Sequence, residues 1–256
     1  MSLQFILGNS GSGKSRYAYE KIIGESMKNP EENFLVIVPE QFTMQTQKEL
    51  VSLHPKKGIL NIDVQSFQRL AYHVFEEVGA DRRTVLEETG KNLLLRKVAI
   101  EQQDRLRVLR GNLKKIGYIT EMKSMISELT QYDITSEQLD EMIRYAENKP
   151  GIFYKLQDIQ VLYEAFREKR KGKYITSEEI LGLLCDVAEQ SRMLQGSRIL
   201  LDGFTGFTPV QQKLLKKLLK LADRVTVTIT IDAGENFWKT GGMHELFYLS
   251  RKTIRI

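Results

Sequence analysis

Residues 3–15 read Leu-Gln-Phe-Ile-Leu-Gly-Asn-Ser-Gly-Ser-Gly-Lys-Ser, an apolar run that leads directly into a complete G-x-x-x-x-G-K-S loop. The glycines let backbone N–H groups turn inward around a triphosphate, and the helix that begins near Lys14 points its positive end at the same anion. In such a loop Lys14 reaches the β- and γ-phosphates, while the Ser15 hydroxyl faces Mg²⁺. The sequence therefore predicts a site for ATP and Mg²⁺ at Gly8, Asn9, Ser10, Gly11, Ser12, Gly13, Lys14 and Ser15.

The neighbouring segments place this loop in a parallel sheet. Apolar runs at residues 34–38, 199–201 and 225–231 are typical of strands that are buried on both faces. The last run alternates with threonine, so we expect it nearer an edge of the sheet. Between residues 84 and 195 the apolar spacing is helical, and patterns of helix starts stand at residues 135, 176 and 208.

The strand predicted at residues 198–201 ends in Asp202, which we expect to hold Mg²⁺ directly or through water. Asp202 follows the loop by more residues than one compact sheet requires, so residues 84–195 are a predicted insertion. Residues 1–83 and 196–256 are then the two parts of the core. This organisation predicts an α/β fold of the P-loop NTPase class, similar to superfamily 1 helicases, with a parallel sheet and a large all-helical insertion.

Composition narrows the class further. Of 256 residues, 41% are hydrophobic, which suffices for a substantial core. The single cysteine, Cys185, excludes a disulfide framework or a cysteine-based metal site within these residues. The sequence shows neither a signal-type segment nor an apolar stretch of about eighteen residues, so we expect a cytoplasmic protein without membrane contact. The net charge of +5 permits nucleic-acid binding without requiring it.

Four blocks occur at residues 8–15, 36–43 (Val-Ile-Val-Pro-Glu-Gln-Phe-Thr), 66–72 (Ser-Phe-Gln-Arg-Leu-Ala-Tyr) and 201–209 (Leu-Asp-Gly-Phe-Thr-Gly-Phe-Thr-Pro). In this order they resemble the N-terminal region of AddB, a subunit of the bacterial ATP-dependent helicase/nuclease AddAB. The first block is shared with many ATPases, whereas the other three are much more particular. Together the four blocks span nearly the whole chain.

The resemblance implies a fragment, truncated at its C-terminus, of a longer protein that processes DNA double-strand breaks for recombinational repair. It implies a heterodimer with an AddA-type helicase/nuclease subunit, which supplies the motor, and contacts with single- and double-stranded DNA. It also implies a C-terminal nuclease domain with an iron–sulfur cluster held by four cysteines. Because this chain has one cysteine, the cluster is expected only in the missing C-terminal part.

Active helicases of this kind place a glutamate after the magnesium-binding aspartate, but here the next residue is Gly203. Loss of a positioned base typically lowers a rate by about 10²- to 10⁴-fold. We therefore expect the chain to bind ATP but to hydrolyse it slowly, and we assign no catalytic residue. Glu40 stays open as a substitute base.

Six residues in the particular blocks combine base-edge hydrogen bonding with stacking rings: Gln41, Thr43, Phe67, Arg69, Tyr72 and Phe207. By resemblance they belong to the channel that receives the unwound 3′-ended strand and senses the Chi hotspot. Glutamine and arginine form paired hydrogen bonds with bases, and aromatic faces stack on them. For Phe67 and Phe207, core packing is an equally good interpretation, because the apolar residues around Phe67 have helical spacing.

Two alternatives stay open. A small-molecule kinase, or another nucleotide-binding module unrelated to DNA, would use the same loop, although no arginine-rich lid is recognisable. A purely structural module would carry a vestigial loop. Lysines at residues 213, 216, 217 and 220 share one helix face and permit phosphate contacts, but a solvated face explains them better.

Overall fold

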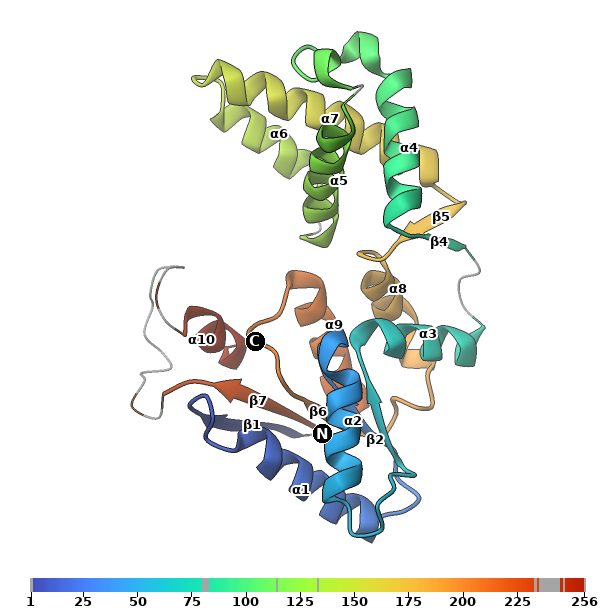
Figure 1. Cartoon of the computed structure of the whole chain (residues 1–256), viewed down its shortest axis with the longest axis vertical. Coiled ribbons are helices and arrows are strands. Elements are labelled where there is room, and N and C mark those ends of the chain that lie inside the picture. Colours follow the sequence, from blue (N-terminus) through green and yellow to red (C-terminus); the bar gives the residue numbers. More distant parts are fainter. Residues whose placement is uncertain are drawn as a thin grey trace. The chain divides into compact units, whose positions relative to one another are not determined.

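The computed structural model describes residues 2–79, 83–113, 115–132, 134–232, 234, 245 and 247–255 (Figure 1). It divides into two compact units, one formed by Met1–Ala80 with Leu181–Ile256 and the other by Asp81–Ile180. Each unit has its own hydrophobic core. The second unit overlaps most of the insertion predicted at residues 84–195.

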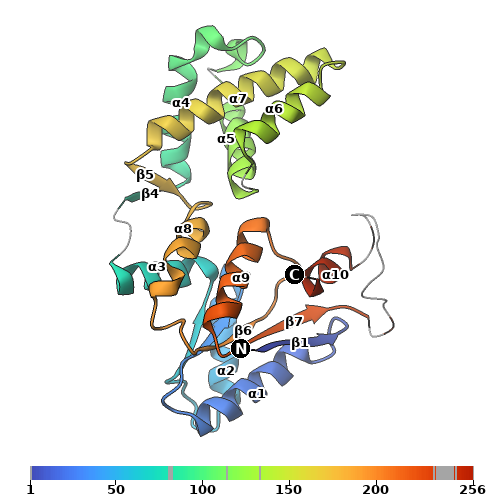
Figure 2. The ribbon, with the colours of Figure 1, turned by 180° about the vertical axis from the view of Figure 1, so that it is seen from behind.

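The first unit is built on a five-stranded sheet whose paired strands are all parallel (Figures 1 and 2). Its strands are β1 (Ser2–Gly8), β2 (Phe34–Ile37), β3 (Ile62–Gln65), β6 (Arg198–Leu201) and β7 (Arg224–Thr230). The order across the sheet is β1-β7-β6-β2-β3. Parallel strands end at a common edge, which is where ligands bind in such sheets. The loop after β1 and the residue after β6 therefore lie at the same edge, one strand apart.

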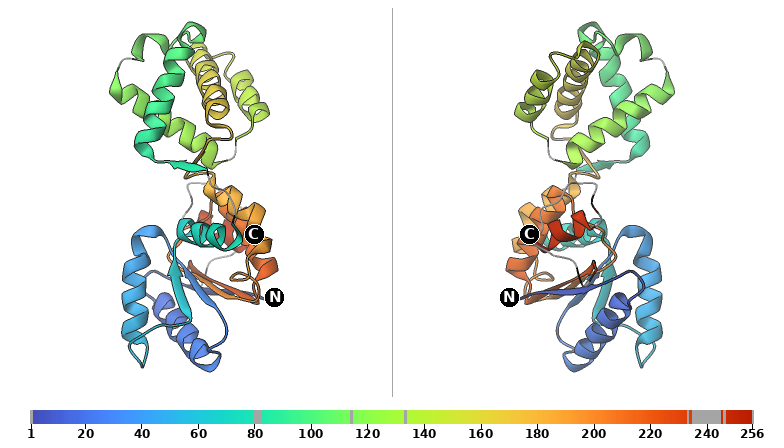
Figure 3. Two further views of the ribbon diagram at one scale, coloured as in Figure 1. Left: turned by 90° about the vertical axis from the view of Figure 1, so that its right-hand side faces the viewer. Right: turned by 90° about the vertical axis from the view of Figure 1, so that its left-hand side faces the viewer.

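Helices cover both faces of this sheet. Figure 3 shows α1 (Lys14–Lys28) and α2 (Thr43–Leu53), in blue, on one side and α9 (Pro209–Leu221), in orange, on the other. The core on the α1 side consists mainly of Ala18, Tyr19, Ile22, Ile23, Phe34, Val36, Val38, Leu50, Ile62 and Leu200. The remaining helices are α3 (Phe67–Val78), α8 (Ile180–Val187), which begins at the unit boundary, α10 (Tyr248–Ile254), and the short 3-10 helices η1 (Glu40–Phe42) and η4 (Ala188–Gln190).

All four predicted strands are confirmed, as is the parallel sheet. The last strand, expected nearer an edge, is the second in the sheet: β7 lies between the edge strand β1 and β6. Thr226 and Thr228 are only 8% and 5% exposed, whereas Thr230 at the end of the strand is exposed. Strand β3 was not predicted, because Asp63 and Gln65 interrupt its apolar pattern in only four residues.

The second unit is mainly helical. It contains α4 (Glu88–Glu101), α5 (Ile116–Gln131), α6 (Ser136–Tyr145), α7 (Pro150–Arg170) and the 3-10 helices η2 (Gln103–Arg105) and η3 (Arg110–Asn112). The prediction that the insertion is all-helical needs a correction, because β4 (Thr84–Leu86) and β5 (Tyr174–Thr176) pair in parallel. Strands of three residues are too short to leave a periodic pattern in the sequence.

A buried carboxylate orders the segment between α4 and α5. Asp158 of α7 is 1% exposed and accepts hydrogen bonds from the backbone N–H groups of Arg107, Val108 and Leu109. The donor–acceptor distances are 2.8 to 3.1 Å. Buried backbone N–H groups need such partners, so Asp158 fixes a segment that lacks a regular ladder of its own.

Two of the predicted helix starts are confirmed and one is wrong. Thr135 and Thr208 each form a capping box with the glutamine three residues further on. Thr176 instead ends β5, and α8 begins only at Ile180. The Glu179 carboxylate accepts a hydrogen bond from the Thr176 backbone N–H at 3.0 Å, which stabilises a turn between the two elements.

None of the helices in the part of the chain that the structure describes has the length and apolarity to span a bilayer.

Candidate nucleotide and nucleic-acid site

Two glycines shape the loop that follows β1. Gly11 and Gly13 have φ angles of 74° and 83°, in the left-handed region that residues with a Cβ rarely adopt. The Ser12 backbone N–H donates to the Asn9 carbonyl at 3.2 Å and so closes the loop. Gly13 is also the N-cap of α1 and offers no side chain, so the positive end of the helix faces the loop.

Lys14 lies against this loop. Its Nζ donates to the Asn9 carbonyl oxygen at 2.7 Å. A Cβ on Gly8 would stand 2.6 Å from Ser12 Oγ and 3.3 Å from Lys14 Cγ, so these side chains occupy the space beside the end of β1. The ammonium group is therefore held where the motif predicts phosphates.

Ser15 and Asp202 meet at the predicted metal position. Ser15 Oγ donates to Asp202 Oδ1 at 3.0 Å. Tyr19 of α1 donates its hydroxyl to Oδ2 of the same carboxylate at 2.6 Å, and Thr228 of β7 donates to Oδ1. Asp202 is 4% exposed. Three hydroxyl groups thus provide the hydrogen bonds that a buried carboxylate requires.

Tyr19 is a neutral donor in this cluster. Burial raises the pKa of its hydroxyl, and the charge of Asp202 and the hydrogen bond to it raise the pKa further. The Tyr19 oxygen also lies 3.4 Å from Thr46 Oγ1 of α2. Because Tyr19 follows Ser15 by one helical turn, both hydroxyls project from the same face of α1.

The donor set fits a magnesium ion that is held largely by nucleotide phosphates. Mg²⁺ is usually bound by one or two protein oxygens together with phosphate and water, and Ser15 offers such an oxygen beside the loop. Both oxygens of Asp202 accept hydrogen bonds from hydroxyls, which fits a contact through Ser15 or water better than direct ligation. Among the described residues, no group of three or more His, Cys, Asp or Glu side chains forms a metal site.

The residue after Asp202 has a backbone conformation suited to glycine. Gly203 has a φ angle of 78°, and a Cβ there would lie 3.4 Å from Pro39 Cδ and 3.6 Å from Phe42 Cδ2. These are ordinary contact distances, so it is the conformation, not crowding, that disfavours other residues. Glu40, which the sequence leaves open as a substitute base, forms an ion pair with Arg69.

The polar members of the predicted DNA contacts lie around η1 and the start of α3. Arg69 Nε lies 3.2 Å from Glu40 Oε1, so the two segments meet. Gln41 follows Glu40 in η1 and is exposed. Thr43 is 8% exposed, and its hydroxyl donates to the Glu40 carbonyl at 2.9 Å, which is a local helix-start contact. Tyr72 is half-buried.

The aromatic members form a cluster with a third ring. Phe67 and Phe207 have ring centroids 6.4 Å apart, and Phe204 lies 5.2 Å from the first and 5.1 Å from the second. Phe67 is 6% exposed and Phe207 8%, as the core-packing interpretation expects. Phe42 is an exposed ring at this edge of the sheet, with 41% of its surface accessible.

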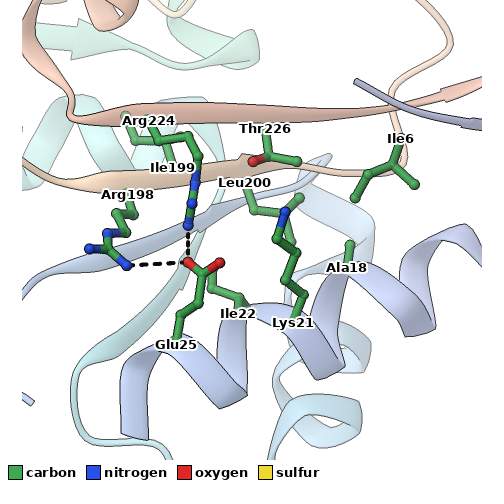
Figure 4. A pocket seen from close by; sticks show the side chains of 10 residues that line it. All are labelled: Ile6, Ala18, Lys21, Ile22, Glu25, Arg198, Ile199, Leu200, Arg224 and Thr226. Atoms are coloured by element: carbon green, nitrogen blue, oxygen red, sulfur yellow. Dashed lines mark hydrogen bonds and ion pairs between the residues drawn. The ribbon is translucent and has the colours of Figure 1, made fainter. Parts of the chain in front are cut away.

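A separate pocket lies at the opposite edge, between α1 and the amino ends of β6 and β7. Figure 4 shows Glu25 of α1 between Arg198 and Arg224, where it forms ion pairs with both. Arg198 also pairs with Glu32 at 2.8 Å. Because carboxylates match the arginines here, the pocket stabilises the packing of α1 and does not offer an anion site.

Tyr19, Thr228 and Phe42 are site residues that the sequence did not reveal. The spacing of four residues between Ser15 and Tyr19 was a usable signal, since it places both on one helix face. The threonines of β7 were another, because polar residues in an interior strand need a polar partner. Phe42 lies inside one of the particular blocks, and only its exposure distinguishes it from the buried rings.

Comparison with known proteins identifies the chain's relatives. The family described as "ADDB, N-terminal" matches residues 5–256. A Lachnoclostridium phytofermentans protein, named as a subunit of an ATP-dependent helicase/deoxyribonuclease, is 53% identical over 252 residues, which are 98% of this chain and 22% of that protein. A protein of the same name from Alkaliphilus metalliredigens is 34% identical over 253 residues, or 99% of this chain and 22% of that protein. The chain thus spans about a fifth of the length of these relatives.

Proposed function

The chain belongs to the AddB N-terminal family, and from that membership we propose that its loop at residues 8–15 binds ATP with Mg²⁺ in a P-loop domain related to superfamily 1 helicases. The observation that carries the proposal is the hydrogen bond between Ser15 and Asp202. It joins the loop after β1 to the end of β6, and strand β7 lies between β1 and β6 in the sheet. The names of the relatives speak of a helicase and a deoxyribonuclease, which favours a DNA-processing role over a small-molecule kinase.

Each residue of the loop has a distinct task in this proposal. Backbone N–H groups between Gly8 and Ser15 surround the phosphates, together with the positive end of α1. Lys14 exchanges its contact with the Asn9 carbonyl for phosphate oxygens. Ser15 supplies an oxygen to Mg²⁺, and Asp202 orients that hydroxyl through its hydrogen bond. The bound Mg²⁺ would neutralise charge on the β- and γ-phosphates.

The domain holds ATP without turning it over at a motor's rate. Because residue 203 is a glycine, no side chain directly follows Asp202 to activate water, and Glu40 is paired with Arg69. A domain of this kind acts as a nucleotide-bound structural part of a helicase/nuclease, and the motor resides in another chain.

Nucleotide titration tests this proposal. We expect the chain to bind ATP in the presence of Mg²⁺, and Lys14→Ala to abolish binding while the far-ultraviolet circular dichroism stays the same. Lys28→Ala is the matched control, because Lys28 is exposed at the other end of α1. Unchanged ATP affinity in Lys14→Ala, or no binding by the unmodified chain, would refute the nucleotide site.

At the same edge of the sheet we place a track for single-stranded DNA that contributes to Chi recognition. The exposed Gln41 and Arg69 support this assignment, since they meet at Glu40 and offer base-edge hydrogen bonds. In this proposal Thr43, Tyr72, Phe67 and Phe207 complete the track beside these two side chains. Phe67 and Phe207 act mainly by packing, because little of either ring is exposed.

Fluorescence anisotropy with a labelled single-stranded oligonucleotide tests this assignment. We expect affinity to fall as salt rises, as for contacts with phosphates. Arg69→Ala should weaken binding, whereas Arg192→Ala, at an exposed position elsewhere in the unit, should not. Equal loss in both variants would reduce the track to nonspecific charge attraction.

In a full-length protein, this domain would serve recombinational repair of double-strand breaks in a heterodimer with an AddA-type helicase/nuclease. Such a complex engages double-stranded DNA at the break, and it works in the cytoplasm, where the bacterial chromosome lies. The nuclease centre and an iron–sulfur cluster belong to the remainder of the longer protein. The single cysteine here, Cys185, is buried and cannot ligate a cluster by itself.

A further inference from the structure

Ser15 and Tyr19 of α1 donate hydrogen bonds to the two oxygens of the Asp202 carboxylate. Ser15 Oγ donates to Asp202 Oδ1 at 3.0 Å, and Tyr19 donates to Oδ2 at 2.6 Å. Thr228 adds a second hydrogen bond to Oδ1 from β7. With donors on both oxygens, the carboxylate is held in one orientation about its bond to Cβ.

The phenol is itself held on several sides. Tyr19 is 3% exposed, and its ring belongs to the core cluster with Ile22, Ile23 and Phe34. Its oxygen lies 3.4 Å from Thr46 Oγ1 of α2. A side chain so restricted positions its partner more accurately than a mobile surface group does.

The hydrogen bonds form a chain that ends at the loop. When the Ser15 proton points to Asp202, the lone pairs of the Ser15 oxygen are left for a cation beside the phosphates. Asp202 therefore orients Ser15, and Tyr19 orients Asp202. Loss of the phenol hydroxyl would leave Oδ2 without a donor, so that only the two hydrogen bonds to Oδ1 orient the carboxylate, and the acceptor of Ser15 would be held less firmly.

We propose that Tyr19 is a positioning residue for magnesium-dependent nucleotide binding, acting through Asp202 and Ser15. The inference rests on the proposed nucleotide site and adds a residue outside the loop and outside the acidic strand end. It assigns a role to a tyrosine that packing alone would explain as an ordinary core residue.

The test compares ATP affinity with excess Mg²⁺ and with EDTA for the unmodified chain and for Tyr19→Phe. Removal of a group that orients a metal ligand typically costs about 10- to 100-fold in affinity, and Tyr19 acts one step further away. We therefore expect affinity in Mg²⁺ to fall about fivefold and affinity in EDTA to stay unchanged. Tyr17→Phe is the matched control, because Tyr17 lies in the same helix and is 59% exposed.

A second comparison uses Asp202→Asn as the background. Because Tyr19 acts through Asp202, adding Tyr19→Phe to Asp202→Asn should change the affinity in Mg²⁺ no further. This comparison keeps the inference open to refutation even when Tyr19→Phe alone fails to fold, because the neutral amide no longer requires the phenol as a donor.

Three results would overturn the inference. In the first, folded Tyr19→Phe keeps the magnesium dependence of the unmodified chain. In the second, it loses affinity equally in Mg²⁺ and EDTA, which indicates a structural role only. In the third, it weakens Mg²⁺-dependent binding further in the Asp202→Asn background. If the unmodified chain does not bind ATP at all, the nucleotide site itself is refuted, and the inference with it.

Discussion

Ser15 and Asp202 stand 187 positions apart in the sequence, and a hydrogen bond of 3.0 Å joins their side chains. The contact fastens the first turn of α1 to the end of β6, across the strand β7 that separates β6 from β1. It brings together two segments that the sequence assigns to one site only from their motifs. The same carboxylate also holds Tyr19 and Thr228, so one side chain links a helix and two strands.

Asp202→Ala should destabilise the folded chain. The substitution leaves the buried hydroxyl groups of Tyr19 and Thr228, and the half-buried one of Ser15, without their acceptor, and an unsatisfied buried polar group costs about 1–3 kcal/mol. Some of these groups will find other partners, so we expect a loss of about 2–4 kcal/mol in urea denaturation. Asp186→Ala, at an exposed position of α8, should cost less than about 0.5 kcal/mol. Equal stability of the two variants would contradict the role of Asp202.

Gly203→Glu should not create an ATPase. Although it restores the residue type found in motors, a side chain at a φ angle of 78° strains the backbone by about 1–2 kcal/mol. Steady-state phosphate release should stay at the background of the unmodified chain, and the melting temperature should fall. Gly203→Asn is the control, since asparagine tolerates this conformation at lower cost. A clear gain of phosphate release in Gly203→Glu would show that only the missing carboxylate prevents hydrolysis.

Phe67→Ala should reduce stability far more than Phe42→Ala. Phe67 is buried against Phe204 and Phe207, and truncation of a buried phenylalanine costs about 3–5 kcal/mol. Phe42 is 41% exposed, so its loss should cost less than about 1.5 kcal/mol. Chemical denaturation of both variants measures the difference. Similar small losses would mean that the aromatic cluster is loosely packed, and Phe67 would then be available to stack on bases.

Glu178→Gln should make the second unit less stable at neutral pH but not in acid. Lys91 has a side chain 3% exposed and pairs with Glu178, 15% exposed, at 2.8 Å. Burial alone would raise the pKa of Glu178, but the hydrogen bond and charge of Lys91 hold it below the ordinary 4.5. A carboxyl group whose pKa is lowered in the folded state stabilises that state at pH values above its unfolded pKa. This stabilisation is lost as the pH falls through the folded pKa.

We therefore expect Glu178→Gln to lower the free energy of unfolding by about 1–3 kcal/mol at pH 7. This is less than the loss for a fully broken buried ion pair, because Glu88 still contacts Lys91. The cost should shrink steadily below pH 4.5. Urea denaturation across pH measures it, and Glu168→Gln, at an exposed position of α7, is the control. A difference between variant and parent that is independent of pH would show that the charge of Glu178 is not what matters.

Local patterns predicted much of the first unit. A few consecutive residues were enough to predict the loop, four of the five strands and the helix start at Thr208. The same holds for the helix start at Thr135 in the second unit. Strand β3 and the pair β4–β5 were missed because three or four residues carry too little periodicity. Thr176 misled because the capping pattern also suits a turn in which Glu179 accepts from the Thr176 backbone.

What the sequence could not predict depends on distant partners. The spacing from Ser15 places Tyr19 on the same face of α1, but it does not show that the Tyr19 hydroxyl reaches Asp202. The threonines of β7 call for polar partners, but they do not show which residue Thr228 contacts. Likewise, the spacing of Phe67 and Phe207 suits either a core or a stacking surface, and only the contact with Phe204 and the small exposed fraction distinguish the two. Burial is a property of the whole fold, so it cannot be inferred from a short block.

The contact between Lys14 and the Asn9 carbonyl, at 2.7 Å, has a consequence for ligand selection. An incoming anion must displace this bond before the ammonium group can turn toward it. An anion with a single phosphate or sulfate group gains too little from one lysine to do so, whereas a polyphosphate also recruits the amides of the loop and the helix end. If the loop binds ATP as proposed, it would therefore select for the number of phosphate groups: adenosine monophosphate or inorganic sulfate should compete poorly with a nucleoside triphosphate, whichever base the triphosphate carries.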